Sequence, residues 1–413
     1  MLKKKRTEVN ILVFNCGSSS VSYKVFKADD VKNIAVVVAG KAHRVGVKGK
    51  ESSFVEHKYN GQIQKNMLPI TNYRQAASLI LNFIKENNLQ IDCIGNRFVH
   101  GGVYFQNSAF VDAESIIKLE LCLPLAPLHN PIALSVISES KNIYPGIRQY
   151  VVFDSAFHST IPDYAFTYAL PKRIVEKYTY RKYGFHGLSY SYVVKTVADF
   201  LETPVEKLNI VACHLGTGGS SVAAIQGGCS VDTSMGFSPL SGLVMSTRCG
   251  DIDPMIIIYL MIFYGYRNDD LLNLLNKKSG LLGVSGFSSD IRDIIDRIPG
   301  GKQARLAFNM YIQRLRKYIG SFITAALGRL DVLIFTDDIG IKSPLVREKV
   351  CDEMQWTGII LDKKKNKNYG MKKPELLNSR ESKVRIVAIP TDEETVIAWE
   401  GIKLLKEEKN AAF

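Results

Sequence analysis

The sequence predicts an α/β protein built from two similar domains, and three observations lead to this prediction. Predicted strands come first, and helices then alternate with strands, which is typical of an α/β domain. A strand, a turn rich in Gly and Ser and a returning strand occur near residue 15 and again near residue 216. The chain has 413 residues, enough for about two or three domains of roughly 150 residues each.

The first half begins with a predicted β-hairpin. The apolar run 11–14 reads as a strand, "NCGSSS" (15–20) as a tight polar turn, and 21–26 alternates with the period of a returning strand. The apolar patterns that follow predict further strands and one amphipathic helix. The expected strands are 36–38, 63–67 and 96–100, and the expected helix is 75–85.

The second half repeats this order. A buried strand is expected over 208–215, followed by the turn "GTGGSS" (216–221) and a returning strand over 222–225. Further on we expect helical sections at 253–276 and 302–327 and strands at 331–335 and 385–389. The stretch "FTDDIG" (335–340) should be a loop after a buried strand, and 391–406 a helix with Thr391 as N-cap and Glu394 completing a capping box.

Composition is that of an ordinary globular enzyme, with 46% hydrophobic and 23% charged residues. The net charge is +13, but the basic runs 3–6 and 363–367 are not interleaved with aromatic residues as a base-stacking surface would be. We therefore expect no nucleic-acid partner, and the positive charge suits the long-range attraction of small anionic substrates.

The seven cysteines form an odd set without CxxC or metal-ligand spacing. They read as buried, reduced thiols in a reducing compartment. The apolar run 9–14 is too short for a signal sequence or a membrane span. We expect a cytoplasmic protein that does not associate with membranes.

Several segments carry residues suited to phosphate chemistry. The turn "NCGSSS" offers N–H and hydroxyl donors, although such turns are common in hairpins without a ligand. Arg97 lies in a segment that would otherwise be apolar, which favours an anion-binding arginine beside a small apolar pocket. His129 stands between two prolines and is as often structural as functional at such a place.

Three more residues complete the predicted chemistry. Asp154 ends a buried strand, where ligand crevices of α/β sheets form, although a helix cap is an alternative. His186 stands between two glycines, and Arg248 lies in a segment rich in small residues. Two arginines, histidines and carboxylates are what phosphoryl transfer with Mg²⁺ requires.

Nine segments, in order and across nearly the whole chain, resemble the acetate kinases. They are "ILVFNCGSSS", "NRFVHGG", "LAPLHNP", "VFDSAFHSTIP", "YGFHGLS", "CHLGTGGSS", "DTSMGFSPLSGLVMSTRCGDIDP", "KSGLLGVS" and "IPTDEE". The resemblance implies two ribonuclease-H-like (actin-like ATPase) domains with a cleft between them, over 1–157 with helix 393–413, and over 158–392. It also implies a homodimer whose domains close over small-molecule substrates.

The resemblance also implies roles for individual residues. Arg97 and Arg248 would bind the carboxylate and the transferring phosphoryl group, His186 would donate to the phosphoryl oxygens with support from His129, and Asp154 would orient the acyl side. The remaining implied sites are an acyl pocket at Val99, Leu128, Phe185 and Pro239, a phosphate site at Ser18, Ser20, His214, Gly216, Thr217 and Gly218, a nucleotide-pocket remnant at Asp290, Arg292, Asp337, Asp338 and Gly340, and Mg²⁺ at Asn15 and Glu393.

The departures from the family pattern matter most. The family's adenosine loop reads roughly Phe-Thr-Gly-Gly-Ile-Gly-Glu-Asn, whereas Asp337 and Asp338 stand here in place of two glycines. Two carboxylates should exclude a purine from bare backbone, and Thr217 and Ser22 replace the family's Asn and Lys. In these features the chain resembles the pyrophosphate-linked acetate kinase of amoebae, which converts acetyl phosphate and orthophosphate to acetate and pyrophosphate.

Two alternatives remain open. One is an ATP-dependent acetate or propionate kinase whose altered loop swings aside, with the bulky Phe98 and Val99 favouring acetate as the smaller acid. The other is a non-catalytic binding protein on the same scaffold, because a fold alone does not prove activity.

Overall fold

The computed structural model describes residues 8–47 and 52–411 of the chain. The basic run 3–6 lies outside these residues. The chain divides into two compact units, one formed by Met1–Ala156 with Asp392–Phe413 and the other by Phe157–Thr391. The division into domains over 1–157 with 393–413 and over 158–392 stays a prediction.

The first unit is an eight-stranded sheet in the order β5-β4-β3-β2-β1-β6-β8-β7. β1 pairs antiparallel with β2 in the predicted hairpin and parallel with β6 on its other side. The strands are β1 (Val9–Cys16), β2 (Ser20–Ala28), β3 (Ile34–His43), β4 (Phe54–Tyr59), β5 (Gln62–Met67), β6 (Cys93–Phe98), β7 (Ala109–Phe110) and β8 (Arg148–Phe153).

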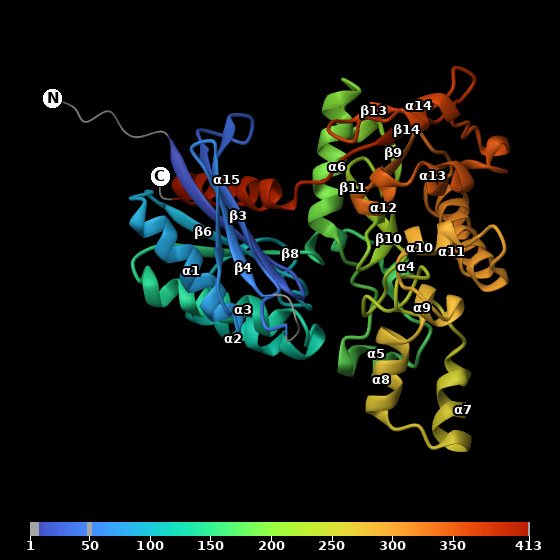
Figure 1. The fold of residues 1–413 in the computed structure, drawn as a ribbon, viewed down its shortest axis with the longest axis horizontal. Helices are drawn as coiled ribbons and strands as arrows, with labels where there is room; N and C mark the ends of the chain where they lie inside the picture. The colour runs from blue at the N-terminus through green and yellow to red at the C-terminus, as the bar shows by residue number, and fades with distance from the viewer. Residues whose placement is uncertain (1–7, 48–51, 412–413) are drawn as a thin grey trace. The chain divides into compact units, whose positions relative to one another are not determined.

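Helices cover both faces of this sheet (Figure 1). The helices are α1 (Tyr73–Glu86), α2 (Ala113–Leu121), α3 (Asn130–Ile143) and α15 (Glu393–Ala411). Leu12 and Phe14 of β1 pack with α1 and α3 in one core. α15 contacts β1 and β6, so closely that a Cβ on Gly95 would stand 2.8 Å from Ile397 Cγ2. Glycine at position 95 therefore allows α15 to pack directly on the centre of the sheet.

The second unit is a six-stranded sheet in the order β11-β10-β9-β12-β14-β13. Successive residues of β9 enter two different cores: Val211 and Cys213 pack with α11, and Ile210 and Ala212 with α6. The strands are β9 (Asn209–Leu215), β10 (Ser220–Gln226), β11 (Cys229–Thr233), β12 (Val332–Thr336), β13 (Glu375–Leu376) and β14 (Arg385–Ala388). Burial on both faces explains why β9 and β12 read as largely apolar runs.

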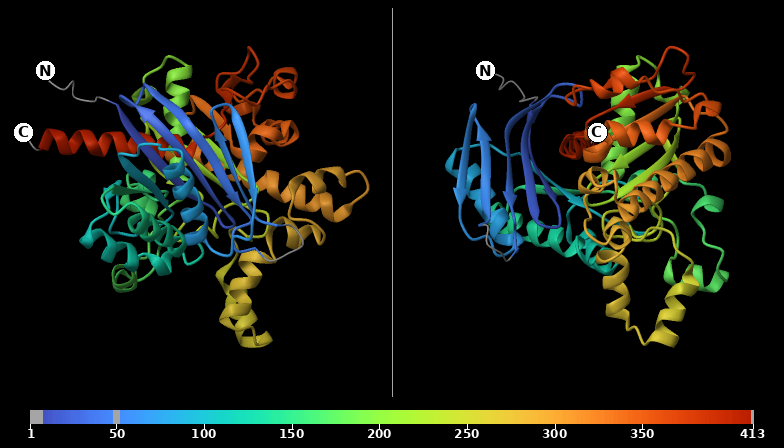
Figure 2. Two further views of the ribbon diagram at one scale, coloured as in Figure 1. Left: turned by 60° about the vertical axis from the view of Figure 1, so that its left-hand side comes forward. Right: turned by 45° about the vertical axis from the view of Figure 1, so that its right-hand side comes forward.

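The helices of the second unit lie around this sheet, and α7 with α8 projects from it (Figure 1 and Figure 2). They are α4 (Asp163–Phe166), α5 (Lys172–Tyr178), α6 (Gly187–Phe200), α7 (Pro254–Tyr264), α8 (Asn268–Lys277), α9 (Gly280–Ser285), α10 (Ile291–Asp296), α11 (Lys302–Ser321) with a π-helical extension Phe322–Leu327, α12 (Asp337–Lys342), α13 (Pro344–Cys351) and α14 (Lys363–Lys367). Within residues 8–47 and 52–411, no helix is long and apolar enough to cross a membrane.

The two sheets share one strand order, which confirms the repeat predicted from the sequence. In each unit three antiparallel strands are followed by two parallel ones, as β3-β2-β1-β6-β8 and as β11-β10-β9-β12-β14. Both central hairpins also coincide with the two Gly/Ser turns that the sequence singled out. The predicted α/β fold class of ribonuclease-H-like units is therefore confirmed.

Three local predictions were wrong. Residues 337–340 form no loop, because β12 runs directly into helix α12. Thr391 does not cap α15; Asp392 Oδ1 accepts the N–H of Thr395 instead, at 3.1 Å. Among the cysteines, which were all expected to be buried, Cys229 is exposed and Cys249 is half-buried.

Candidate functional site

In the first unit, a buried ion pair joins the ends of two neighbouring strands. Arg97 on β6 donates from Nε to Asp154 Oδ1 at 2.8 Å and from Nη2 to Oδ2 at 2.6 Å. Asp154 follows the last residue of β8 and is 1% exposed, so this carboxylate binds an arginine and is not a helix cap. Burial by itself would lower the pKa of Arg97, but the charges of Asp154 and Glu393 outweigh this and hold it above its usual value.

Asn15 connects this pair to the start of α15. Asn15 Oδ1 accepts from Arg97 Nη1 at 3.0 Å, and its Nδ2 donates to Glu393 at 3.0 Å and to Glu394 at 3.1 Å. Lys24 Nζ lies 2.7 Å from both oxygens of Asp392. The sequence analysis gave no site role to Lys24, Asp392 or Glu394, and an acidic helix start facing the first hairpin is the signal that could have found them.

The cluster around Asn15 has a surplus of negative charge. It contains four carboxylates and two cations: Asp154, Asp392, Glu393 and Glu394 against Arg97 and Lys24. Burial and the neighbouring carboxylates raise the pKa of Glu394 despite the opposing charge of Lys24. A divalent cation would relieve this repulsion.

The carboxylate oxygens of this cluster are ligands that suit Mg²⁺. The resemblance to the acetate kinases assigns Mg²⁺ to Asn15 and Glu393. Mg²⁺ prefers oxygen ligands and usually binds through one or two carboxylates while keeping water or phosphate oxygens. Among the described residues, no three His, Cys, Asp or Glu side chains form a metal-binding group. A magnesium ion here would therefore depend on water or substrate oxygens for the rest of its coordination.

The first hairpin turn offers less to a phosphate than the sequence suggested. The N–H of Gly17 is already bonded to the carbonyl of Ser20 at 2.9 Å. Ser18 is exposed and Ser20 is half-buried. The hydroxyls and the remaining N–H groups of the turn are what could contact an anion.

The segment around His100 is tied to the start of α3 by Asn130, which sequence reasoning missed. Asn130 Nδ2 donates to the carbonyls of His100 at 3.0 Å and Cys122 at 2.7 Å, and its Oδ1 accepts from the N–H of His100 at 3.2 Å. These bonds hold the segment that contains Val99 and His100 to the one that contains His129 and Asn130. Leu128 is 62% exposed, and Val99 and His129 are half-buried.

The prediction that Phe98 narrows an acyl pocket was wrong. Phe98 is fully buried in a core with Phe105, and its ring meets that of Phe153 edge-on at 5.8 Å. Phe98 therefore cannot line a pocket for acetate. Of the proposed pocket residues, Val99 and Leu128 belong to the first unit and Phe185 and Pro239 to the second, so that pocket stays a prediction.

In the second unit, two histidines stack and each is held by a serine. The rings of His186 and His214 are 4.0 Å apart and 26° from parallel. His186 Nδ1 lies 2.8 Å from Ser221 Oγ, which also meets the hydroxyl of Tyr190 at 2.5 Å. His214 Nδ1 lies 2.9 Å from Ser189 Oγ. These contacts fix the plane of each ring, which a hydrogen-bond donor to a transferring phosphoryl group needs.

A third histidine, His158, supports this arrangement and was not predicted. It is fully buried between Ser230 Oγ at 2.8 Å and the carbonyl of Phe185 at 3.0 Å. Burial lowers the pKa of His158 to about 4, so the ring is neutral at pH 7. A Cβ on Gly184 would stand 2.5 Å from His158 Cδ2. Glycine at 184 thus lets the turn before His186 pass over this buried ring.

Arg248 closes the second Gly/Ser turn. Its Nη2 donates to the carbonyl of Gly218 at 2.6 Å and its Nη1 to that of Pro239 at 2.7 Å. A Cβ on Gly219 would stand 2.5 Å from Nη2. Burial lowers the pKa of Arg248, and its two partners are neutral carbonyl oxygens. Arg248 therefore presents a positive charge that these contacts do not cancel, beside the exposed Thr217 and Gly218.

The two aspartates of α12 point to different places. Asp337 Oδ2 lies 3.1 Å from His214 Nε2 and 2.3 Å from where a Cβ on Gly216 would be. Asp338 instead pairs with Lys342 at 2.6 Å on the surface. Of the other residues assigned to the nucleotide-pocket remnant, Gly340 is buried in α12, and Asp290 pairs with Arg292 at the start of α10.

Arg347, which sequence reasoning also missed, holds α12 in place. It is fully buried, and its Nη1 donates to the carbonyls of Gly340 and Ile341, both at 2.7 Å. Asn366 Oδ1 accepts from its Nε at 2.6 Å. Burial lowers the pKa of Arg347 to about 10, which still leaves it charged at pH 7. Arg347 therefore binds the carbonyl end of α12 as a cation.

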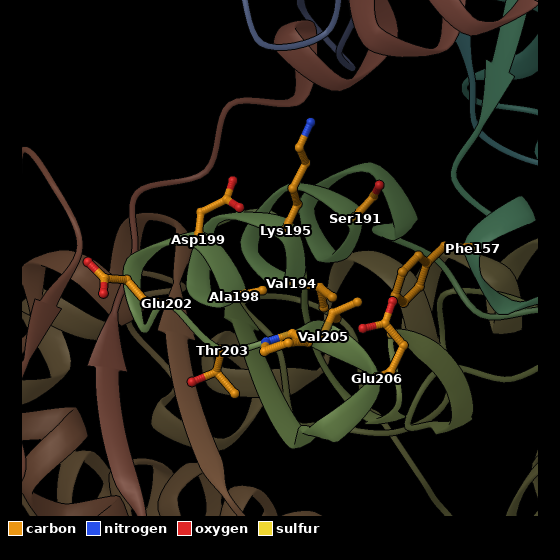
Figure 3. A pocket seen from close by; sticks show the side chains of 12 residues that line it. Phe157, Ser191, Val194, Lys195, Ala198, Asp199, Glu202, Thr203, Val205 and Glu206 are labelled. Carbon is orange, nitrogen blue, oxygen red and sulfur yellow. The ribbon is translucent and has the colours of Figure 1, made fainter.

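A surface hollow of about 670 Å³ lies elsewhere on the second unit, along α6 (Figure 3). Its walls include Phe157, Val194, Ala198 and Val205, and Lys195 stands at its edge. None of the arginines or histidines described above lines it. This hollow is thus separate from the candidate catalytic residues.

Known proteins resemble this chain in sequence and in fold. A sequence profile of the Acetokinase family matches residues 10–399. An acetate kinase from Thermoanaerobacter pseudethanolicus is 43% identical over 96% of this chain and 99% of that protein. The crystal structure of acetate kinase from Entamoeba histolytica is 47% identical with a TM-score of 0.86, covering 95% of this chain and 99% of that one.

A crystal structure of a propionate kinase from Francisella tularensis is also similar, with 36% identity and a TM-score of 0.86 over 95% of this chain and 98% of that one. The chain belongs to the acetokinase family.

Proposed function

We propose that this chain is a pyrophosphate-linked acetate kinase, which converts acetyl phosphate and orthophosphate to acetate and pyrophosphate. An orthophosphate oxygen would attack the phosphorus of acetyl phosphate in line, while the bond from phosphorus to the acetyl oxygen breaks and acetate leaves. The observation that carries this proposal is helix α12, where Asp337 and Asp338 occupy the positions of two glycines in the family's adenosine loop.

The fixed position of α12 supports exclusion of a nucleotide. A loop that swings aside would have to break the two bonds from Arg347 Nη1 to the α12 carbonyls. It would also have to remove Ile339 and Ile341, which are 5% and 7% exposed, from the core. Arg347 would keep Asn366 as a partner, but leaving its buried Nη1 without acceptors costs about 1–3 kcal/mol. The ATP-dependent alternative requires this movement or a nucleotide that avoids α12.

Each unit would contribute one part of the transfer machinery. In the second unit, Arg248 and His186 would donate to the phosphoryl oxygens, and His214 with the turn 216–218 would bind the phosphate acceptor. In the first unit, Arg97, oriented by Asp154, would bind the acyl carboxylate. Mg²⁺, held by Asn15 and Glu393, would neutralise charge on the phosphate oxygens. This division follows the general need of phosphoryl transfer for positioning and electrostatic stabilisation.

The acceptor assay tests the proposal directly. Acetyl phosphate and Mg²⁺ are incubated with either orthophosphate or ADP, and ³¹P NMR follows formation of pyrophosphate or ATP. We expect pyrophosphate with orthophosphate and at least about a hundredfold lower rate with ADP. ATP formation without any pyrophosphate would refute the proposal, and no turnover with either acceptor would favour the non-catalytic alternative.

We also propose that the chain acts in the cytoplasm. We further propose that it forms a homodimer in which α7 of each subunit lies in the interface. This helix has the sequence PMIIIYLMIFY, and all eleven of its residues are at least partly exposed. Ile262 and Phe263 are 67% and 66% exposed. Contiguous apolar surface of this kind marks an interaction site. Ile262→Glu with Phe263→Glu should convert the dimer to a monomer in light-scattering chromatography, and a monomeric unmodified chain would contradict this.

A further inference from the structure

The carboxylate of Asp337 occupies the mouth of the second Gly/Ser turn. Its Oδ2 is 3.1 Å from His214 Nε2 and would be 2.3 Å from a Cβ on Gly216. The turn itself is closed by the N–H of Gly216 bonding to the carbonyl of Gly219 at 3.1 Å. Only a glycine at 216 leaves room for this carboxylate. The side chain thus lies against the same histidine and backbone that would hold a phosphate.

The backbone of Asp337 directs its side chain there. Asp337 has a φ of +63°, a conformation that aspartate and asparagine tolerate better than most residues other than glycine. The rest of α12, which begins at Asp337, is anchored by the hydrogen bonds from Arg347 to Gly340 and Ile341. A change of partner at His214 therefore requires rotation of the Asp337 side chain and not a shift of the helix.

Asp337 is ionised in this environment. Burial raises its pKa, but the charge of His214 and the hydrogen bond from it outweigh burial and leave the pKa below its usual value. Lys342, further along α12, acts in the same direction. A negative charge thus lies where the negative charge of a phosphate would go, and two anions in contact repel each other strongly in a partly buried site.

We propose that Asp337 is a specificity-determining residue that competes with phosphate for His214. In this exchange an oxygen of inorganic phosphate, or of the terminal group of pyrophosphate, replaces the Asp337 carboxylate as the partner of His214 Nε2. This exchange of partners makes and breaks only hydrogen bonds and ion pairs. This inference rests on the proposed function in one respect, namely that the turn 216–219 receives a phosphate group. The competition weakens binding of phosphate and favours its release.

Calorimetric titration of the full chain with inorganic phosphate and with pyrophosphate tests this exchange. The variants are Asp337→Asn, which is isosteric and neutral and tolerates the positive φ, and Asp337→Gly, which removes the side chain. The control is Glu353→Gln, which neutralises an exposed carboxylate paired with Arg316 at 2.9 Å. We expect both Asp337 variants to bind both anions about tenfold more tightly or better, and the control to bind them as the unmodified chain does.

The sign of the change decides the matter. If Asp337 instead orients His214 for phosphate, both variants bind phosphate more weakly, and this overturns the proposal. Unchanged affinity, or no binding by any of the four proteins, overturns it as well. Thermal unfolding checks that each variant is folded. The titration needs no acyl substrate, so its result does not depend on the acceptor assay. If that assay shows no pyrophosphate synthesis, the proposed function is refuted, but the measured affinities for phosphate keep their meaning.

Discussion

The ion pair between Arg97 and Asp154 makes a sharp prediction about stability. Asp154→Ala removes two charge-assisted hydrogen bonds, from Nε at 2.8 Å and from Nη2 at 2.6 Å. It leaves a guanidinium whose side chain is only 16% exposed. Breaking a buried pair by removing one partner costs about 3–5 kcal/mol. Arg97 keeps Asn15 at 3.0 Å and Glu393 at 3.7 Å, so we expect about 2–4 kcal/mol.

The two tryptophans of the chain make the measurement specific to one unit. Trp399 lies on α15 in the first unit, and Trp356 is 76% exposed in the second. In a Trp356→Phe background, fluorescence during urea unfolding reports the first unit alone. Asp154→Ala, Arg97→Met and the double variant form a double-mutant cycle.

The cycle separates the interaction from simple loss of packing. We expect the double variant to be more stable than Asp154→Ala alone, because it no longer buries an uncompensated cation. The coupling free energy should be about 1.5–3 kcal/mol. A loss below about 1 kcal/mol in Asp154→Ala, or additive effects in the double variant, would refute the view that Asp154 compensates a buried charge.

The remaining predictions concern the second unit and the packing of α15. His158 has a pKa of about 4 against an ordinary 6.5. Its contribution to stability is therefore complete above pH 6.5 and is lost as pH falls towards 4, by about 1.4 kcal/mol per pH unit. His158→Gln should flatten this part of the pH profile in thermal unfolding. Arg248→Lys cannot bond to both carbonyls as the planar guanidinium does, so kcat of phosphoryl transfer, measured in the acceptor assay on folded protein, should fall about a hundredfold. Gly95→Ala places a Cβ 2.4 Å from the Tyr150 ring, and chemical unfolding should report a loss of about 1–3 kcal/mol.

The repeated architecture could be predicted from the sequence because its signals are local. The strand at 11–14 is apolar throughout and the strand at 208–215 is largely apolar, and each is followed by a turn rich in small residues. Such patterns depend on the period of the strand and on burial of both faces. They need no knowledge of which residues meet in space.

Helix α12 could not be predicted in this way. Its six residues are too few for a helical period, and two aspartates followed by Ile and Gly fit a turn as well as a helix. The helix is held by Arg347 from the next helix and by burial of Ile339 and Ile341. Tertiary contacts therefore decided the local structure.

The supporting residues of the site were missed for a related reason. Asn130, His158 and Arg347 each bond to backbone carbonyls of another segment, and such partners leave no pattern in the sequence around them. The arginines Arg97 and Arg248 were found because a charge within a strand or among small residues is unusual by itself. Sequence reasoning thus finds residues that break a local rule and overlooks those that satisfy distant groups.

The two arginines differ in a way that bears on the transfer reaction. The charge of Arg97 is balanced by Asp154, so a substrate carboxylate that bound there would share a guanidinium that already has an anionic partner. Arg248 is held by the neutral carbonyls of Gly218 and Pro239, and these contacts leave its charge uncompensated. Electrostatic stabilisation of a transition state is most effective when the donor is positioned in advance and needs no rearrangement. Arg248 is therefore the better candidate to stabilise the phosphoryl group in the transition state. Arg97 is the better candidate to position the carboxylic acid substrate.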